Sequence, residues 1–184
     1  MANISYRLYT EFFDQDFKDT ERFKNAVVAS VPKAFGNAFI KNNATATVVT
    51  EQSARYPIDG VSDVNTNIHD FTHVQEDNSL QLTGTAGVFI AQMSFSIKAG
   101  NDNKVGVYLA VNKTGTIDAD ADRISSSEVY VTTDGTTAQD RPVAAAVQAL
   151  VELEQNDKVY GIVQNTSGTT DITVEFMNLI VTRV

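Results

Sequence analysis

Apolar and polar residues alternate at every second position along most of the chain after Thr45, which is the period of a strand with one buried face. The clearest example is 88–97, where Phe89, Met93 and Phe95 share one face and Gln92 lies on the other. Less regular runs predict further strands at residues 45–50, 71–74, 79–83, 104–112, 127–133, 158–164 and 171–183. Turn residues rather than helices separate these segments, so the pattern predicts an all-β antiparallel sandwich or jelly roll.

Two segments of this region need separate treatment. The alanines of 143–153 favour a helix, whereas its valines and short length allow a buried strand, and the sequence leaves both open. Residues 176–181 are apolar on both faces, which predicts a central strand that is covered on both sides.

Residues 1–44 differ in character from the rest of the chain. Phe23, Val27 and Val31 are spaced along one face of a short predicted helix, which Pro32 ends. A second apolar cluster follows at 34–40. We therefore predict a partly helical N-terminal arm at 1–44 and a β-sandwich domain at 45–184. The arm either covers the sandwich as a lid or buries its aromatic side chains against another subunit or a partner.

Composition excludes several classes of function. The chain has 42% hydrophobic and 20% charged residues, which is typical of a globular protein, and no cysteine for disulfides, thiolate nucleophiles or cysteine-ligated metals. The net charge is −9 without any basic run, so we expect no nucleic-acid partner. No apolar stretch approaches the roughly 20 residues of a membrane helix, and charges interrupt the N-terminal region where a signal peptide needs an apolar core. We expect synthesis in a cytoplasm and no membrane partner.

The acidic run 118–122 is the main candidate for a metal site. Asp118, Asp120 and Asp122 alternate as in the first half of an EF-hand loop, but Arg123 replaces the required glycine and Val129 the bidentate glutamate. A solvated turn is the main interpretation and a different kind of calcium site the lesser one.

Other motifs offer little chemistry. His69 and His73 would lie about 13 Å apart on a strand, too far to share a metal ion. The sequence holds no nucleophile elbow, phosphate-binding glycine loop or H-E-x-x-H motif. We therefore expect a protein that is not an enzyme and that needs no cofactor.

Three stretches resemble the trimeric jelly-roll superfamily of tumour necrosis factor and the globular heads of complement. Residues 80–97 are similar to its glycine–aromatic strand, and 150–159 resemble its leucine-alternating strand and tight turn, with Asn156 in place of the usual glycine. Residues 176–181 match its apolar last strand. The resemblance covers 45–184 and implies a homotrimer. The residues assigned on this basis to the trimer interface are Phe176, Met177, Leu179 and Val181.

Residues 165–174 and the ending 181–184 resemble jelly-roll modules of tailed-bacteriophage structural proteins. The leading hypothesis is therefore a virion protein on the capsid surface, a homotrimeric decoration or cement protein whose partner is the major capsid protein. The aromatic residues expected to anchor its arm on the shell are Phe12, Phe13, Phe17, Phe23, Phe35 and Phe39.

Two alternatives remain open. A receptor- or glycan-binding fibre tip of the same fold would use the loops 59–70, 116–127 and 134–141 for recognition. A small carbohydrate-active or other enzyme on a β-sandwich is the third class.

Overall fold

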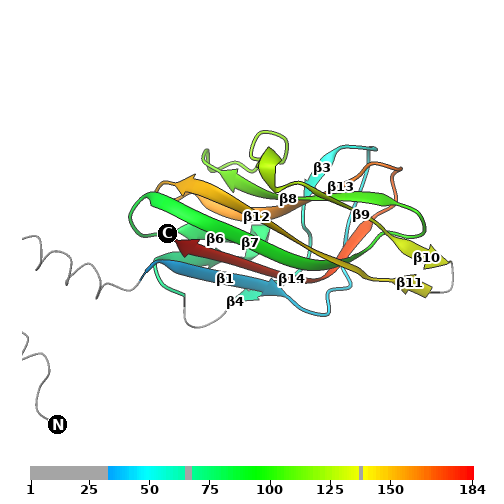
Figure 1. Ribbon diagram of the computed structural model, residues 1–184, viewed down its shortest axis with the longest axis horizontal. Helices are drawn as coiled ribbons and strands as arrows, with labels where there is room; N and C mark the ends of the chain where they lie inside the picture. Colours follow the sequence, from blue (N-terminus) through cyan, green and yellow to red (C-terminus); the bar gives the residue numbers. More distant parts are fainter. Residues whose placement is uncertain (1–32, 65–67, 137–138) are drawn as a thin grey trace, which may run out of the picture. The chain divides into compact units, whose positions relative to one another are not determined.

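The structure is a computed structural model that describes residues 33–64, 68–136 and 139–184. Residues Ala34–Val184 form one compact unit. In this unit two antiparallel sheets, each of six strands, face one another as a sandwich (Figure 1). No helix within the described residues is long and apolar enough to cross a membrane.

The first sheet, called sheet A, contains the longest strands of the protein. In spatial order these are β12 (Val143–Leu153), β7 (Gly87–Lys98), β14 (Ile172–Arg183), β1 (Phe35–Ile40) and β4 (Ser62–Val64). The short strand β2 (Ala46–Thr47) also pairs with β14. All pairings in this sheet are antiparallel.

The second sheet, called sheet B, lies behind sheet A in the view of Figure 1. Its strands in spatial order are β5 (Phe71–Val74), β6 (Ser79–Leu82), β13 (Lys158–Asn165), β8 (Lys104–Asn112) and β9 (Val129–Thr132). Strand β3 (Arg55–Pro57) adds to β13. A separate ribbon of β10 (Asp134–Thr136) and β11 (Gln139–Arg141) and the short helices η1 (Gln75–Asp77) and η2 (Ser125–Ser127) complete the described elements.

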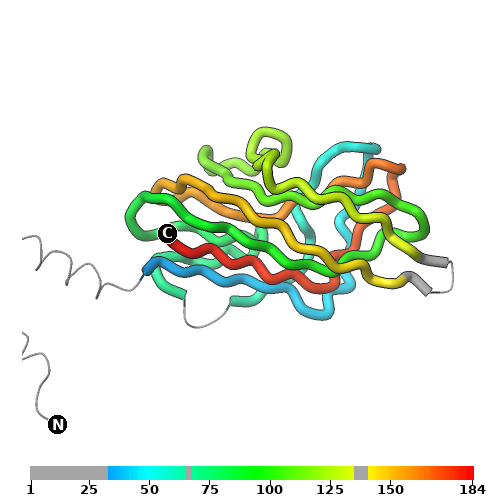
Figure 2. The backbone as a smooth tube through the Cα atoms, in the orientation of Figure 1, coloured from blue at the N-terminus to red at the C-terminus, as the bar shows by residue number. Residues whose placement is uncertain are grey.

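The path of the chain between the sheets is that of a jelly roll. It runs from β6 in sheet B to β7 in sheet A, returns to sheet B for β8 and β9, and crosses again at β12, β13 and β14 (Figure 2). Most neighbouring strands within a sheet are thus distant in sequence, whereas β5 and β6, and β8 and β9, are consecutive strands that pair with one another. The prediction of an all-β antiparallel jelly-roll sandwich is confirmed.

The core lies between the sheets and is built by the inward positions of the alternating strands. Phe71 of sheet B and Phe89 of sheet A meet edge to face, with ring centroids 5.7 Å apart. Gly161 on β13 leaves room for Met93 on β7, because a Cβ atom there would lie 2.7 Å from the Met93 sulfur. The segment whose type was open, 143–153, is strand β12, with Val147 turned inward.

The boundary predicted at residue 45 is too late. Strand β1 pairs with both β14 and β4, and Ala38 and Ile40 are fully buried. A Cβ atom at Gly36 would lie 2.9 Å from Phe71, so the inward side of β1 has only small residues opposite this ring. These small residues hide the period-two pattern in the sequence, and the sandwich begins at Ala34 instead. The helix predicted within 19–31 lies outside the described residues.

Candidate functional site

The outer face of sheet A is the most distinctive surface of the sandwich. The registers of β12, β7, β14 and β1 align its outward side chains in rows across the four strands. From β12 toward β1 the rows are Leu150–Ile90–Thr182–Phe35, Gln148–Gln92–Ile180–Asn37, Ala146–Ser94–Asn178–Phe39 and Ala144–Ser96–Phe176. We call this set of residues the sheet A face.

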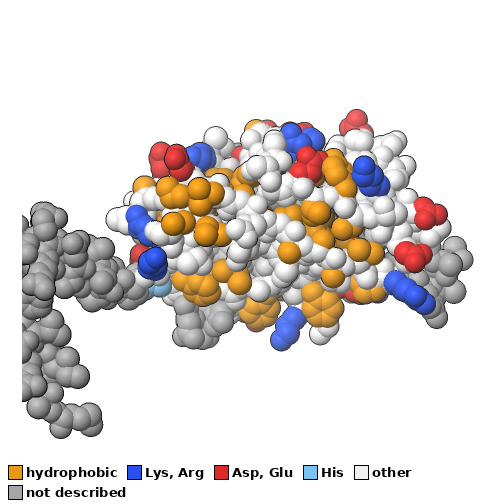
Figure 3. Space-filling view, in the orientation of Figure 1, with side chains coloured by type: hydrophobic (Ala, Val, Ile, Leu, Met, Phe, Trp, Pro, Cys, Tyr) orange, Lys and Arg blue, Asp and Glu red, His pale blue; other side chains and the backbone are white. Residues whose placement is uncertain are grey.

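None of the side chains of the sheet A face is charged, in a chain of which 20% is charged. Charges begin at its margin. On β12 the first is Glu152, and at the end of β7 and β14 it is the ion pair between Lys98 and Glu175, whose atoms lie 2.6 Å apart. Beside Phe39 they are the exposed Asp63, its register partner on β4, and Lys41, whose Nζ lies 5.7 Å from the Phe39 ring centroid. Figure 3 shows hydrophobic side chains over these strands and most charged ones toward the margin of the view. Leu150 is 67% exposed and Phe176 is 45% exposed, so large apolar groups meet solvent here.

The two middle rows of the sheet A face contain polar side chains on all four strands. These are the amides of Gln148, Gln92, Asn178 and Asn37 and the hydroxyl of Ser94. Gln92 Nε2 donates a hydrogen bond of 2.8 Å to Gln148 Oε1. Asn37 Nδ2 donates one of 2.6 Å to Asn178 Oδ1. Together with Ser94 these residues form what we call the polar belt, which has mainly apolar rows on either side, each with one hydroxyl residue, Thr182 or Ser96.

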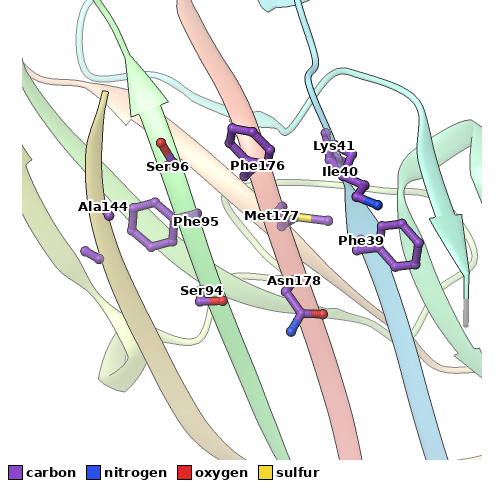
Figure 4. A pocket seen from close by; sticks show the side chains of 11 residues that line it. Phe39, Ile40, Lys41, Ser94, Phe95, Ser96, Ala144, Phe176, Met177 and Asn178 are labelled. Carbon is purple, nitrogen blue, oxygen red and sulfur yellow. The ribbon is translucent and has the colours of Figure 1, made fainter. Parts of the chain in front are cut away.

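Shallow hollows follow the sheet A face. One of about 590 Å³ lies across β1, β7, β12 and β14, and its lining includes Phe39, Phe176 and Lys41 (Figure 4). A second of about 400 Å³ is lined by the belt residues Gln92 and Asn178 and their neighbours. The face is therefore an open, contoured surface rather than an enclosed cleft for a small substrate.

The four residues predicted for a trimer interface divide between the two faces of β14. Phe176 points outward in the sheet A face, whereas Met177, Leu179 and Val181 are buried between the sheets. A β-bulge between Val174 and Phe176 sets this phase. A subunit contact on β14 would have to use Phe176, Asn178 and Ile180, which the double-sided apolar pattern could not distinguish from their neighbours.

The six arm phenylalanines also divide. Phe35 and Phe39 belong to β1 and lie in the sheet A face, because β1 is part of the sheet. The other four lie outside the described residues: Phe12, Phe13, Phe17 and Phe23.

The three aspartates of the acidic run do not converge on one point. Asp118 Oδ1 accepts hydrogen bonds from two backbone N–H groups of its own loop, and Asp120 pairs with Arg55 at 2.5 Å. Asp122 Oδ2 accepts one of 2.8 Å from the Tyr160 hydroxyl. Within the described part of the chain no group of three acidic, histidine or cysteine side chains could hold a metal ion.

The loop that holds these aspartates covers the outer face of sheet B. Its Ala119 packs with Tyr108, Ala110 and Tyr160 in a second small apolar cluster, with Ile117 against it. Burial raises the pKa of the Tyr160 hydroxyl well above its usual range, so it remains a hydrogen-bond donor. The outward tyrosines of β8 and β13 are the sequence signal for this cover, which the strand pattern alone did not reveal.

A polar network beside this cluster also went unrecognised in the sequence. The Tyr108 hydroxyl lies 2.6 Å from Gln164 Oε1 and 2.9 Å from Glu128 Oε1. The guanidinium groups of Arg55 and Arg123 lie 5.6 and 5.5 Å from the Tyr108 ring centroid. The aromatic ring and the charged groups contact one another closely, which indicates a structural role, although Arg55 Nε and Arg123 Nε have no hydrogen-bond partner among the described residues.

The two histidines, His69 and His73, make different contacts in the structure. His73 Nε2 lies 2.7 Å from Ser62 Oγ, which joins β5 at the edge of sheet B to β4 at the edge of sheet A. His69 forms an isolated β-bridge with Phe35.

Of the three loops that a fibre tip would use, only 116–127 is described throughout, and it is tied to sheet B through Asp122. The loop 59–70 lacks 65–67, and 134–141 lacks 137–138, so both are described in part.

Comparisons with known proteins establish the fold. The chain is similar to the structure of Eiger TNF from S. frugiperda, with a TM-score of 0.54 and 12% identity over 84% of this chain and 94% of that one. It is also similar to murine APRIL at pH 5.0, with a TM-score of 0.54 and 6% identity over 83% and 100% of the two chains. No protein-family model and no curated protein matches the chain. The resemblance to the tumour necrosis factor superfamily is thus confirmed at the level of the fold.

Proposed function

We propose that this chain is a non-enzymatic virion structural protein, a homotrimer that decorates or cements a bacteriophage capsid by binding the assembled shell. The sheet A face would hold the three copies together, and residues 1–33 would dock on the major capsid protein.

The observation that carries the self-association is the absence of charge from the sheet A face. Each copy has a net charge of −9, so two copies repel unless they meet through a surface that carries none of it. If this face bound a basic partner instead, we would expect acidic side chains on it. Strand β12 adds a long sheet edge whose outward positions from Ala144 to Leu150 include no lysine or proline, the residues that usually protect such edges.

The number of copies rests on the resemblance to the tumour necrosis factor superfamily, which implies a threefold arrangement. A closed ring of three copies presents the same surfaces at each contact. The large exposed groups Phe176 and Leu150 then become buried, which supplies the driving force for assembly.

The virion assignment rests on the similarity of 165–174 and 181–184 to phage jelly-roll modules. A cement protein acts by linkage: it binds the assembled lattice and not dispersed subunits, so its binding free energy stabilises the shell. A ring of three copies carries three docking segments, and the avidity of joined segments strengthens binding to a repeating lattice without any new contact.

Self-association is tested with a matched pair of variants. Leu150→Asp places a charge on the sheet A face, and Val61→Asp places one at a site of nearly equal exposure, 68% against 67%, directly before β4 and outside the rows of the face. Light scattering after size-exclusion chromatography should give the mass of a trimer for the wild type and for Val61→Asp, and of a monomer for Leu150→Asp. A monomeric wild type would contradict the proposal.

The capsid role is tested separately. The purified protein should sediment with assembled phage shells that lack it and should not bind dispersed capsid subunits. Binding to a glycan array without binding to shells would support the fibre tip instead.

A further inference from the structure

The polar belt is an unexpected feature of a surface that self-association would bury. Burial of uncharged amides contributes less than burial of apolar side chains, and each unpaired amide lowers the stability of the contact. The belt nevertheless spans all four strands of the sheet A face, from Gln148 on β12 to Asn37 on β1.

We infer that the polar belt sets the register and the number of copies in which this chain associates through the sheet A face. The inference rests on the self-association proposed above and adds the residues that make it specific. The partner is a second copy of this chain, because the face lacks the charges that a partner of opposite charge would require.

The apolar rows cannot set a register by themselves. Contacts among Leu150, Ile90 and Phe176 are non-directional, so a copy that slides along the strands exchanges one apolar contact for another. The belt occupies two rows, so a slide by one row, about 7 Å along a strand, would place one of its rows against an outer, mainly apolar row of the next copy. Only the register in which both belt rows meet places every belt amide opposite another belt.

The belt has unused capacity for such pairing. A primary amide has two N–H donors and an acceptor oxygen, and the bond from Gln92 to Gln148 uses one donor and one acceptor lone pair. Gln92, Gln148 and Asn178 are exposed. In a single copy their remaining donors and acceptors can hydrogen-bond to water. In an assembly they can hydrogen-bond to the polar belt of a neighbouring copy.

The pairs within one copy also hold the belt in position. Asn37, which is 8% exposed, donates to Asn178 and to the Leu179 carbonyl oxygen, 3.3 Å away. Its rotamer is therefore defined before association, so less side-chain entropy is lost on contact. Polar residues within an apolar coiled-coil interface fix register and strand number in the same way, at a cost in stability.

The test replaces the belt glutamines in the full-length chain. A Gln92→Leu/Gln148→Leu variant keeps the size of the side chains and removes their amides. The matched control, Gln52→Leu/Gln155→Leu, adds the same apolar groups at exposed positions outside the face. Native mass spectrometry and sedimentation velocity should give one mass for the wild type and the control, and a mixture of masses for the belt variant.

A single belt-variant mass equal to that of the wild type would overturn the inference and leave self-association intact. A monomeric belt variant would also overturn it, since the belt would then supply affinity rather than register. A monomeric wild type would overturn both proposals together.

A second measurement remains valid if the double variant folds poorly. The chain has no cysteine, so Ser94→Cys introduces a single thiol in the belt with little change of shape. A short bismaleimide should cross-link Ser94→Cys copies to one another, whereas Ile90→Cys, in the apolar row, should cross-link at least several-fold less to Ser94→Cys in mixed samples. Equal yields at the two positions would show that copies slide freely and would overturn the inference.

Discussion

The Tyr160 hydroxyl donates a hydrogen bond of 2.8 Å to Asp122 Oδ2 and so joins β13 to the loop that covers sheet B. The same oxygen accepts from Asn112 Nδ2 at 2.9 Å and from the Asp118 backbone N–H at 3.0 Å. One carboxylate thus satisfies three donors from two strands and the loop, which explains why an acidic run closes over an apolar surface.

Asp122→Asn should lower the free energy of unfolding by about 1–3 kcal/mol, since the amide accepts fewer hydrogen bonds and leaves a donor facing other donors. Urea denaturation followed by circular dichroism measures this change. Asp120→Asn is the control: its side chain is 70% exposed and, among the described residues, forms an ion pair with Arg55, so a change below about 1 kcal/mol is expected. Equal losses in the two variants would contradict the role given to Asp122.

Stability should fall in mild acid through His73. Burial lowers the pKa of its imidazole below 6.5, although the carboxylates of Asp63 and Asp77 act in the opposite direction. The unfolded chain therefore binds more protons below pH 6.5, so the contribution of His73 is complete above that pH and is lost as the pH falls through the folded-state pKa.

The measurement is the free energy of unfolding between pH 5 and pH 8, where a His73→Gln variant should show a shallower decline than the wild type. His69→Gln, at a histidine whose side chain is 43% exposed, is the matched control. The interpretation is wrong if both variants follow the wild-type curve.

Asn156 occupies a left-handed turn, with φ of 76°, between β12 and β13. The resemblance of 150–159 to the family's strand and tight turn, with Asn156 in place of the usual glycine, implied this conformation, because asparagine tolerates it better than most residues with a side chain. Asn156→Ala should lower the free energy of unfolding by about 1 kcal/mol, whereas Asn156→Gly should leave it unchanged or raise it. Thermal denaturation of the pair checks this, and an alanine variant as stable as the glycine variant would contradict it.

Gly161→Ala should destabilise the sandwich by overpacking. The added Cβ atom would lie 2.5 Å from Ile58 Cδ1 and 2.7 Å from the Met93 sulfur, so both side chains must move. We expect a loss of about 1–3 kcal/mol in the free energy of unfolding. Gly168→Ala should be nearly neutral by the same urea measurement, because the added Cβ atom would have no described atom within 4 Å beyond its own residue and its two chain neighbours.

Removal of residues 1–33 should leave a folded protein, because the described core belongs to Ala34–Val184. Removal of 1–40 also deletes β1, and the loss of buried Ile40 alone costs about 2–5 kcal/mol. Thermal denaturation should therefore separate the two truncations clearly. If 1–33 is the docking segment, the shorter truncation should fold, self-associate and fail to sediment with capsid shells; retained shell binding would contradict that assignment.

The sequence by itself determined the kind of structure and its local geometry. Period-two alternation around Phe89 and Phe95 and the turn at Asn156 depend on neighbouring residues in the chain, so strands, turns and an antiparallel sandwich could be predicted from it.

Only the tertiary structure decided which strands neighbour one another and which face of each is free. Pairing between β1 and β14 joins residues far apart in sequence, the bulge before Phe176 selects its outward face, and the uncharged rows exist only once four strands are in register. The structural role of Asp122 likewise depends on its hydrogen bond from Tyr160, which lies on β13 and is 38 residues away in the sequence. These properties arise from non-local strand pairing, which a one-dimensional pattern does not contain.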